Sequence, residues 1–162
     1  MKGIGAVIVT YNSEDEIGPC LDSALARVER LVVVDNASTD ATLDEVRKRP
    51  AAGVIANPDN LGFAPAVNQG IRSLDSPLLL ILNPDEPLKT ALEPLAQACR
   101  EPGVAAAAGK LVDDQGWPQR GFSVRRFPTP LALSFEVLGL NRIWPGNPVN
   151  KRYRCAELDL EA

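Results

Sequence analysis

A run of five apolar residues at positions 78–82, followed by Asn83, Pro84 and Asp85, most constrains how this chain can fold. Such a run, bounded by turn residues, is typical of a strand buried on both faces of a parallel sheet. Proline has no N–H group for the hydrogen-bond ladder, so the strand ends at Pro84. Asp85 then lies at the carboxyl end of a central strand, where open parallel sheets bind ligands. Its carboxylate is a metal ligand, an acid–base group or a solvated turn residue.

Further apolar runs alternate with stretches in which apolar residues recur at helical spacing. The additional strands are expected at residues 4–10, 31–34, 54–56 and 104–108. This alternation predicts an α/β fold, with a Rossmann-like, mostly parallel sheet and helices on both faces. After residue 112, turn residues, charges and aromatic residues alternate instead, and we expect a strand around 122–126 and a helix at 131–138. We interpret 1–112 and 113–162 as two parts of a single structural domain.

The composition excludes several classes of protein. A formal net charge of −4 without a large basic cluster argues against nucleic-acid binding. The absence of histidine excludes histidine-based triads and the usual zinc-protease sites. The three widely spaced cysteines fit a reducing compartment. No apolar run approaches about 20 residues, and no signal-peptide pattern is present, so we expect a cytoplasmic location.

Three polar segments follow the first, second and fourth predicted strands, namely residues 10–12, 35–38 and 83–85. In a parallel sheet they meet at one edge and form a candidate nucleotide pocket. Tyr11 can stack on a base, Asp35 can accept a hydrogen bond from a pyrimidine N–H, and Asp85 can hold a hard cation between two phosphates. No glycine-rich phosphate loop follows the first strand, so a metal ion is expected to neutralise the charge of the phosphates. Taken singly, Asp35 and Asp85 are equally well explained as turn or capping residues, and Tyr11 as a half-buried ring.

Four segments of the sequence together resemble family 2 glycosyltransferases. They are residues 7–12, residues 33–40, residues 60–63 with 68–70, and residues 82–85. The Asn-Pro-Asp sequence at 83–85, with residues 109–111 and 125–129, is similar to the bacterial rhamnosyltransferase-like branch of that family. The resemblance extends over about residues 4–130.

The resemblance implies a GT-A fold and an inverting transfer of a sugar, such as rhamnose, from a dTDP- or UDP-linked donor. The acceptor is a glycan or a lipid-linked molecule of cell-envelope polysaccharide synthesis, and the cofactor is Mg²⁺ or Mn²⁺. Asp85 matches the metal-binding aspartate. The positions that match nucleotide-binding residues are Thr10, Tyr11, Asn12, Asp35, Asn36, Asn60, Asn68 and Asn83. Residues 1–112 then form the donor half, and residues 113–162 begin the acceptor side.

One feature of the family has no match in the sequence. An inverting transfer needs a general base to take the proton of the acceptor hydroxyl. Family 2 enzymes carry it after the metal motif, and no such signature occurs up to Ala162. We therefore expect a fragment of a longer enzyme, with a non-catalytic nucleotide-sugar or partner-binding module as the alternative. The sequence leaves the oligomeric state open and is compatible with peripheral association at the inner face of the membrane.

Overall fold

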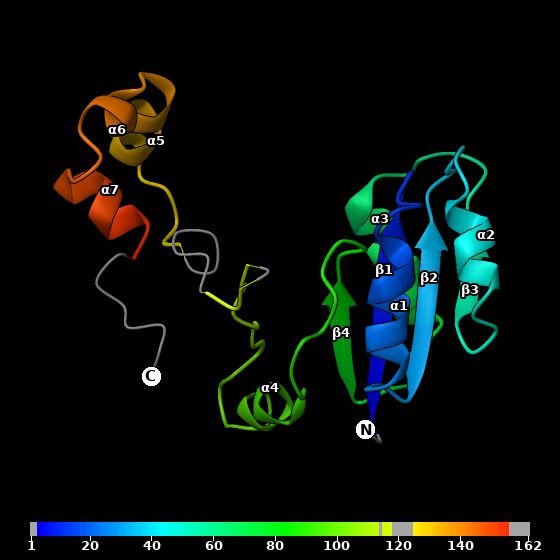
Figure 1. Cartoon of the computed structure of the whole chain (residues 1–162). Coiled ribbons are helices and arrows are strands. Elements are labelled where there is room, and N and C mark those ends of the chain that lie inside the picture. The colour runs from blue at the N-terminus through cyan, green and yellow to red at the C-terminus, as the bar shows by residue number, and fades with distance from the viewer. Residues whose placement is uncertain (1–2, 114, 118–124, 156–162) are drawn as a thin grey trace. The chain divides into compact units, whose positions relative to one another are not determined.

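The computed structural model describes residues 3–113, 115–117 and 125–155. The chain forms two compact units, Met1–Arg100 and Glu101–Ala162 (Figure 1). The boundary between the units falls before residue 112, where the sequence changes character. The assignment of the two parts to donor and acceptor binding stays a prediction.

The first unit contains a four-stranded parallel sheet. Its strands are β1 (Ile4–Thr10), β2 (Arg30–Asp35), β3 (Gly53–Ala56) and β4 (Leu78–Leu82). The spatial order is β3-β2-β1-β4, and all three neighbouring pairs are parallel. The α/β fold with a parallel sheet that the alternating pattern predicts is therefore confirmed.

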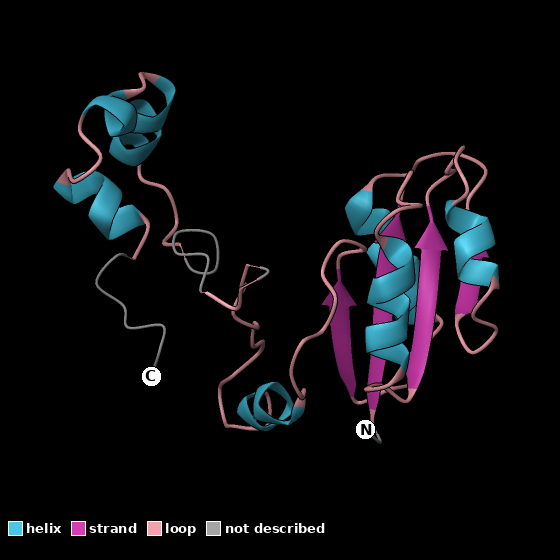
Figure 2. Cartoon of the chain, viewed as in Figure 1, coloured by secondary structure: helices cyan, strands magenta, loops and turns pink. Residues whose placement is uncertain are grey.

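Helices cover both faces of this sheet (Figure 2). The helices α1 (Ile17–Leu25) and α2 (Thr42–Arg47) pack through an apolar core that includes Ile8 and Val33. On the opposite face, α3 (Phe63–Arg72) packs on β1 and β2. The approach of α3 is close, since a Cβ atom at Gly70 would lie 2.4 Å from Val7 Cγ1.

The fourth strand is not buried on both faces, so that prediction is wrong. The side chains of Leu79 and Ile81 are 42% and 50% exposed. Ile81 pairs with Val7, so both exposed residues lie on the α3 side of the sheet. Within the described residues β4 is an edge strand, paired only with β1. The helix α3 packs on β1 and β2 instead. On the other face, Leu80 packs against Leu92 and Ala96 near the short helix α4 (Glu93–Ala98).

The second unit contains the helices α5 (Pro130–Val137), α6 (Leu140–Ile143) and α7 (Pro148–Tyr153). The side chains of Thr129 and Asn147 cap the first and last of them.

The helix expected at 131–138 is confirmed, whereas the strand expected at 104–108 is wrong. Residues 104–108 form an exposed coil, as suits a segment rich in alanine, which has low β propensity. The strand expected around 122–126 lies largely outside the described residues. No helix in the described ranges is both long and apolar enough to cross a membrane.

Candidate functional site

The carboxyl ends of all four strands, β1 to β4, lie at one end of the sheet, which we call the rim. Thr10 pairs with Asp35, Asp35 pairs with Ala56, and Ile8 pairs with Leu82. The strands are parallel neighbours, so the loops that follow them all leave from the rim. Asp35 ends β2 and Asp85 follows β4 by three residues. Both carboxylates therefore belong to the same edge of the sheet.

The carboxylate of Asp35 is buried and held by three hydrogen bonds. The residue is only 1% exposed. Its Oδ1 accepts hydrogen bonds from Thr10 Oγ1 (3.0 Å) and Ser38 Oγ, and its Oδ2 accepts one from Ser38 N (3.0 Å). Ala37 adopts a left-handed conformation with φ 64°, which a non-glycine residue seldom does, as the chain turns between Asp35 and Ser38. Asp35 therefore shapes the loop after β2, and Oδ2 keeps a lone pair for a further donor.

The loops after β1 and β2 are joined by hydrogen bonds between their polar residues. Asn12 N donates to Ser38 Oγ (2.9 Å), and Thr39 N donates to Asn12 Oδ1 (2.9 Å). Asn12 has φ 52°, a left-handed conformation that asparagine tolerates. Tyr11 is 52% exposed on this joined surface. Stacking of its ring on a base stays a prediction.

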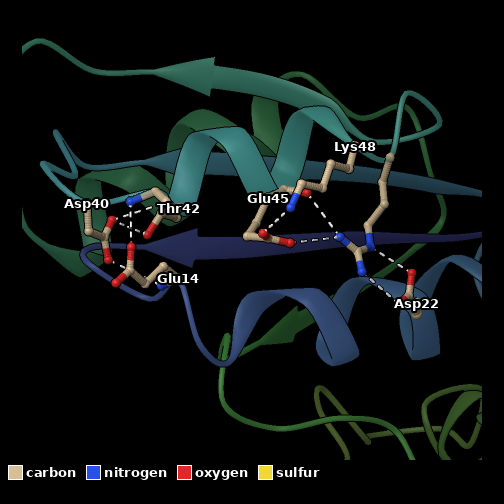
Figure 3. Close-up of polar contacts among 8 residues, drawn as sticks. Glu14, Asp22, Asp40, Thr42, Glu45 and Lys48 are labelled. Carbon is tan, nitrogen blue, oxygen red and sulfur yellow. Dashed lines mark hydrogen bonds and ion pairs between the residues drawn. The ribbon is translucent and has the colours of Figure 1, made fainter.

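A second group of contacts joins the same two loops at Glu14 and Asp40 (Figure 3). Glu14 N donates to Asp40 Oδ2 (3.2 Å), and Ala41 N donates to Glu14 Oε2 (2.7 Å). Desolvation raises the pKa of Asp40, but hydrogen bonds from the Thr42 side chain and from the N–H groups of Thr42 and Glu14 outweigh it. The pKa of Asp40 therefore lies below its ordinary value, and the carboxylate stays charged and bonded at neutral pH.

Ion pairs join the two helices that follow these loops. Arg49 contacts Asp22 of α1 at 2.6 Å and Glu45 of α2 at 3.6 Å. Figure 3 labels the two acidic partners, Asp22 and Glu45, and marks their ion pairs with dashed lines. The hydrogen bonds from Arg49 lower the pKa of Asp22.

An amide network that the sequence analysis missed fixes the loop after β3. Asn36 Nδ2 donates to Gly62 O (3.1 Å), and Asn57 Nδ2 donates to Asn36 Oδ1 (3.0 Å). Asn57 and Gln69 also exchange hydrogen bonds of 2.9 and 3.0 Å. The position of Asn57 directly after the third predicted strand was the available signal. The role of Asn36 in this structure is to connect the loops after β2 and β3.

Two of the predicted nucleotide-binding residues, Asn60 and Asn68, lie at different distances from the rim. Asn60 belongs to the loop after β3, and its Oδ1 accepts a hydrogen bond from Gly62 N (2.9 Å). Asn68 is exposed on α3, five residues beyond Phe63, which is about 7.5 Å along a helix. Asn60 is therefore placed at the rim, whereas Asn68 lies more than one turn away from it.

The loop after β4 presents exposed polar side chains. Asn83 and Asp85 are both exposed, and no hydrogen bond or ion pair to Asp85 occurs within the residues that the structure describes. Beneath the loop, Cys20 Sγ donates to Asn83 O at 3.3 Å. Burial raises the pKa of Cys20 to about 12, and the negative charge of Asp85 adds to the effect. Cys20 therefore remains a neutral thiol and a hydrogen-bond donor at neutral pH.

The rim suits a metal ion that is shared with phosphate groups. In the part of the chain that the structure describes, no group of three or more Cys, Asp or Glu side chains is placed to hold a metal. Mg²⁺ commonly uses one or two protein carboxylates together with substrate phosphates and water. An exposed carboxylate such as Asp85 matches that requirement, with the exposed amide of Asn83 close to it in sequence.

The second unit contains a cavity of its own. Its volume is about 430 Å³, and its lining includes Arg126, Phe127, Leu131, Val149, Arg152 and Tyr153. Arg126 N donates to Tyr153 O (3.0 Å), and the Arg125 guanidinium lies 5.7 Å from the centre of the Tyr153 ring. The residues that line the cavity thus include two arginines, Arg126 and Arg152, together with apolar residues such as Leu131.

The comparison with protein families matches residues 6–151 to the model described as glycosyl transferase family 2. The chain belongs to this family. Comparison with solved structures gives similarity to the mannosyltransferase PcManGT from Pyrobaculum calidifontis, solved with GDP-Man and Mn²⁺. The identity is 24%, the TM-score is 0.57, and the match covers 63% of this chain and 33% of that one.

A second similar structure is S. aureus TarS, with 25% identity and a TM-score of 0.53. That match covers 59% of this chain and 19% of TarS. This family 2 chain therefore spans a third or less of the length of either structure. The likeness confirms the expected GT-A fold. The comparison with curated proteins gave no match. The rhamnosyltransferase-like branch and the roles of the individual rim residues remain predictions.

Proposed function

We propose that this family 2 chain binds a nucleoside-diphosphate sugar at the rim and serves in metal-dependent transfer of the sugar. The observation that carries the proposal is the exposed carboxylate of Asp85 on the same rim as Tyr11 and Asp35. The rim thereby offers an aromatic surface, hydrogen-bond acceptors and a metal ligand within one set of loops. GDP-Man and Mn²⁺, present in the mannosyltransferase of similar fold, belong to this ligand class.

The base and the ribose occupy the side of the rim formed by β1, β2 and β3. Tyr11 stacks on the base, and the remaining lone pair of Asp35 Oδ2 accepts a hydrogen bond from its ring N–H. Thr10 orients Asp35 through its 3.0 Å hydrogen bond. Asn12, Asn36 and Asn60 hold the rim loops through their hydrogen bonds. Asn83, exposed in the loop after β4, serves as a nucleotide contact, and Asn68, more than one turn along α3, is the proposed contact farthest from the rim.

The diphosphate lies near Asp85, which would hold Mg²⁺ or Mn²⁺. The bound metal would stabilise the negative charge of the departing diphosphate. The acceptor hydroxyl oxygen bonds to the anomeric carbon from the opposite face as the carbon–oxygen bond to the diphosphate breaks. The hydroxyl proton passes to a general base, which we assign to no described residue. The rhamnosyltransferase-like motifs favour rhamnosyl transfer from a dTDP- or UDP-linked donor in cell-envelope polysaccharide synthesis.

A thermal-shift experiment tests donor binding. The chain is heated with Mn²⁺ plus UDP, dTDP or GDP, and again with EDTA in place of the metal. We expect Mn²⁺ with UDP or dTDP to raise the melting temperature, and Asp85→Ala to abolish that rise. Asp75→Ala is the matched control, because Asp75 is an exposed aspartate three residues before β4, at the opposite edge of the sheet.

Two results would contradict the proposal. One is a folded protein that no metal–nucleotide pair stabilises. The other is an Asp85→Ala variant with the full metal-dependent shift. A transfer assay with the bound donor then distinguishes the two hypotheses, an enzyme and a non-catalytic binding module. Binding without transfer favours the nucleotide-sugar-binding module, and transfer to a glycan or lipid-linked acceptor favours the enzyme.

We further propose that the acceptor is an anionic lipid-linked molecule, which the second unit contacts at the inner face of the membrane. Residues 125–155 contain six basic residues and one acidic residue, although the whole chain has a net charge of −4. Large apolar side chains are exposed beside them, including Phe127 at 98% and Val137 at 85%. A surface of this kind suits anionic headgroups above apolar chains.

Vesicle sedimentation tests this contact. We expect binding to vesicles that contain an anionic phospholipid and none to neutral vesicles. Arg126→Ala with Arg152→Ala should weaken the binding, since both residues line the cavity. Arg47→Ala with Arg72→Ala, which removes two exposed arginines of the first unit, is the control of equal charge change. Equal loss in both pairs would contradict a specific role for the cavity.

A further inference from the structure

Three polar side chains on one stripe of α1, or just beyond its end, reach the loop that follows β4. They are Cys20, Ser23 and Arg27, which are spaced three and four residues apart and so lie on one face of the helix. Their partners are backbone groups within residues 83–90. The same loop carries the exposed Asp85. The stripe therefore supports the loop in which the side chain of Asp85 has no hydrogen bond or ion pair among the described residues.

The thiol of Cys20 contacts the backbone on both sides of Asp85. Its Sγ lies 3.3 Å from Asn83 O and 3.8 Å from Glu86 O. The turn between these carbonyls is closed by Glu86 N, which donates to Asn83 O (3.3 Å). The single S–H group can donate to only one of these carbonyls at a time, but the buried thiol contacts both ends of the short segment in which Asp85 lies.

Ser23 and Arg27 hold the continuation of the loop. Ser23 Oγ accepts a hydrogen bond from Leu88 N (2.8 Å) and donates to Cys20 O (2.8 Å). Arg27 Nε donates to Thr90 O (3.0 Å), and its Nη1 donates to Ser23 O (2.8 Å). The three anchors are linked to one another through the backbone of α1.

The composition of the loop explains why side chains of α1 are needed to hold it. Pro84 and Pro87 have no N–H group, so the loop cannot form a continuous backbone ladder. The side chain of Asp85 has no hydrogen bond or ion pair among the described residues, so its position depends on its backbone. A metal ligand must be placed within a few tenths of an ångström, which the anchored backbone can provide.

From these contacts we propose that Cys20 and Ser23 are positioning residues that set the place of Asp85 for metal binding. The inference rests on the proposed metal role of Asp85. It adds that side chains of α1 affect metal binding through the position of Asp85. Residues that orient metal ligands typically change metal affinity by about 10- to 100-fold when they are removed. Neither side chain touches the metal or the sugar in this proposal.

The first test compares Ser23→Ala with Ser73→Ala. Both serines donate to the carbonyl three residues earlier, at 2.8 Å for Ser23 and 2.7 Å for Ser73. Only Ser23 also accepts from the loop after β4. The measured quantity is nucleotide affinity, with UDP or dTDP as the probe, in EDTA and at increasing Mn²⁺. For Ser23→Ala we expect the Mn²⁺ concentration that gives half of the full increase in nucleotide affinity to rise about tenfold. The nucleotide affinity in EDTA should be unchanged. Ser73→Ala should match wild type in both.

The second test uses the cysteines. Cys20→Ala should raise the Mn²⁺ requirement in the same way, whereas Cys20→Ser, which keeps a donor at this position, should restore part of the affinity. Cys99→Ala is the control, because Cys99 follows α4 and is half-buried. The melting temperature without ligand is measured for every variant, so that a loss of folded protein is not counted as a loss of metal affinity.

The outcomes separate this inference from the proposed function. If wild-type protein shows no Mn²⁺-dependent nucleotide binding, the metal role of Asp85 and the inference built on it both fail. If wild type responds to Mn²⁺ and both Ser23→Ala and Cys20→Ala respond at the same concentration, the metal role stands and the positioning role is wrong. A rise in the Mn²⁺ requirement for these two variants, with none for Ser73→Ala and Cys99→Ala, supports it.

Discussion

The two aspartates of the rim, Asp35 and Asp85, are held in opposite ways. Asp35 is buried, and three hydrogen bonds from Thr10 and Ser38 fix its carboxylate directly. Asp85 is exposed, and only the backbone around it is fixed, through Cys20 and the rest of the α1 stripe.

The difference indicates how each carboxylate can contribute. A buried carboxylate that accepts several hydrogen bonds stabilises the loop that it closes and is costly to remove. An exposed carboxylate on an anchored loop keeps its oxygens available to a cation, and its removal leaves no buried group without a partner. The stability of the rim and its proposed metal chemistry therefore depend on different residues.

The largest effect on stability is expected for Asp35→Ala. The substitution leaves Thr10 Oγ1 and the Ser38 N–H without their acceptor, and Thr10 is itself 1% exposed. We expect the free energy of unfolding to fall by about 2–4 kcal/mol, measured by urea denaturation. Asp35→Asn, which keeps one acceptor oxygen, should lose less. An Asp35→Ala variant as stable as wild type would show that the hydrogen bonds of this loop do not stabilise the fold.

The sequence was sufficient to predict that Asp35 and Asp85 share an edge of the sheet. Apolar runs that alternate with helical spacing imply parallel strands, and parallel neighbours place their following loops together. The end of the strand before Asp85 was equally predictable from the sequence, because Pro84 cannot extend the hydrogen-bond ladder. The α/β fold and the polar loops at the rim therefore follow from local pattern.

The different burial of the two aspartates could not be predicted in the same way. The burial of Asp35 depends on the register that sets Thr10 beside it and on the left-handed turn at Ala37. Similarly, the exposed face of β4 depends on strand order, which an apolar run does not reveal. The pairing of Asn57 with Gln69 requires β3 and α3 to be already packed together. Apart from the local turn at Ala37, each of these features depends on how segments far apart in the sequence pack together.

A smaller effect is expected from pH at the thiol that anchors the Asp85 loop. Burial raises the pKa of Cys20 from 9.0 to about 12, so the folded state retains the proton after the unfolded state has begun to lose it. This contribution to stability is complete below pH 9 and is lost as the pH rises from 9 towards 12. We expect the free energy of unfolding, measured in EDTA, to fall more steeply over this range in wild type than in Cys20→Ala.

Wild type and Cys20→Ala share every other titratable group, so the difference between their slopes carries the test. If Cys20→Ala and wild type lose stability in parallel above pH 9, the thiol is not protected by its burial. The contacts of Cys20 with the two carbonyls would then be weaker than their geometry indicates.

The smallest effect on stability is expected for Asp85→Ala, although Asp85 lies on the same rim as Asp35. No hydrogen bond or ion pair within the described residues is lost, and an exposed side chain supports no core packing. We expect the free energy of unfolding in EDTA to change by less than about 0.5 kcal/mol, measured by urea denaturation beside Asp35→Ala. A loss as large as that of Asp35→Ala would mean that Asp85 is a structural turn residue. The two rim carboxylates would then be alike, and the assignment of a metal to the loop after β4 would lose its main support.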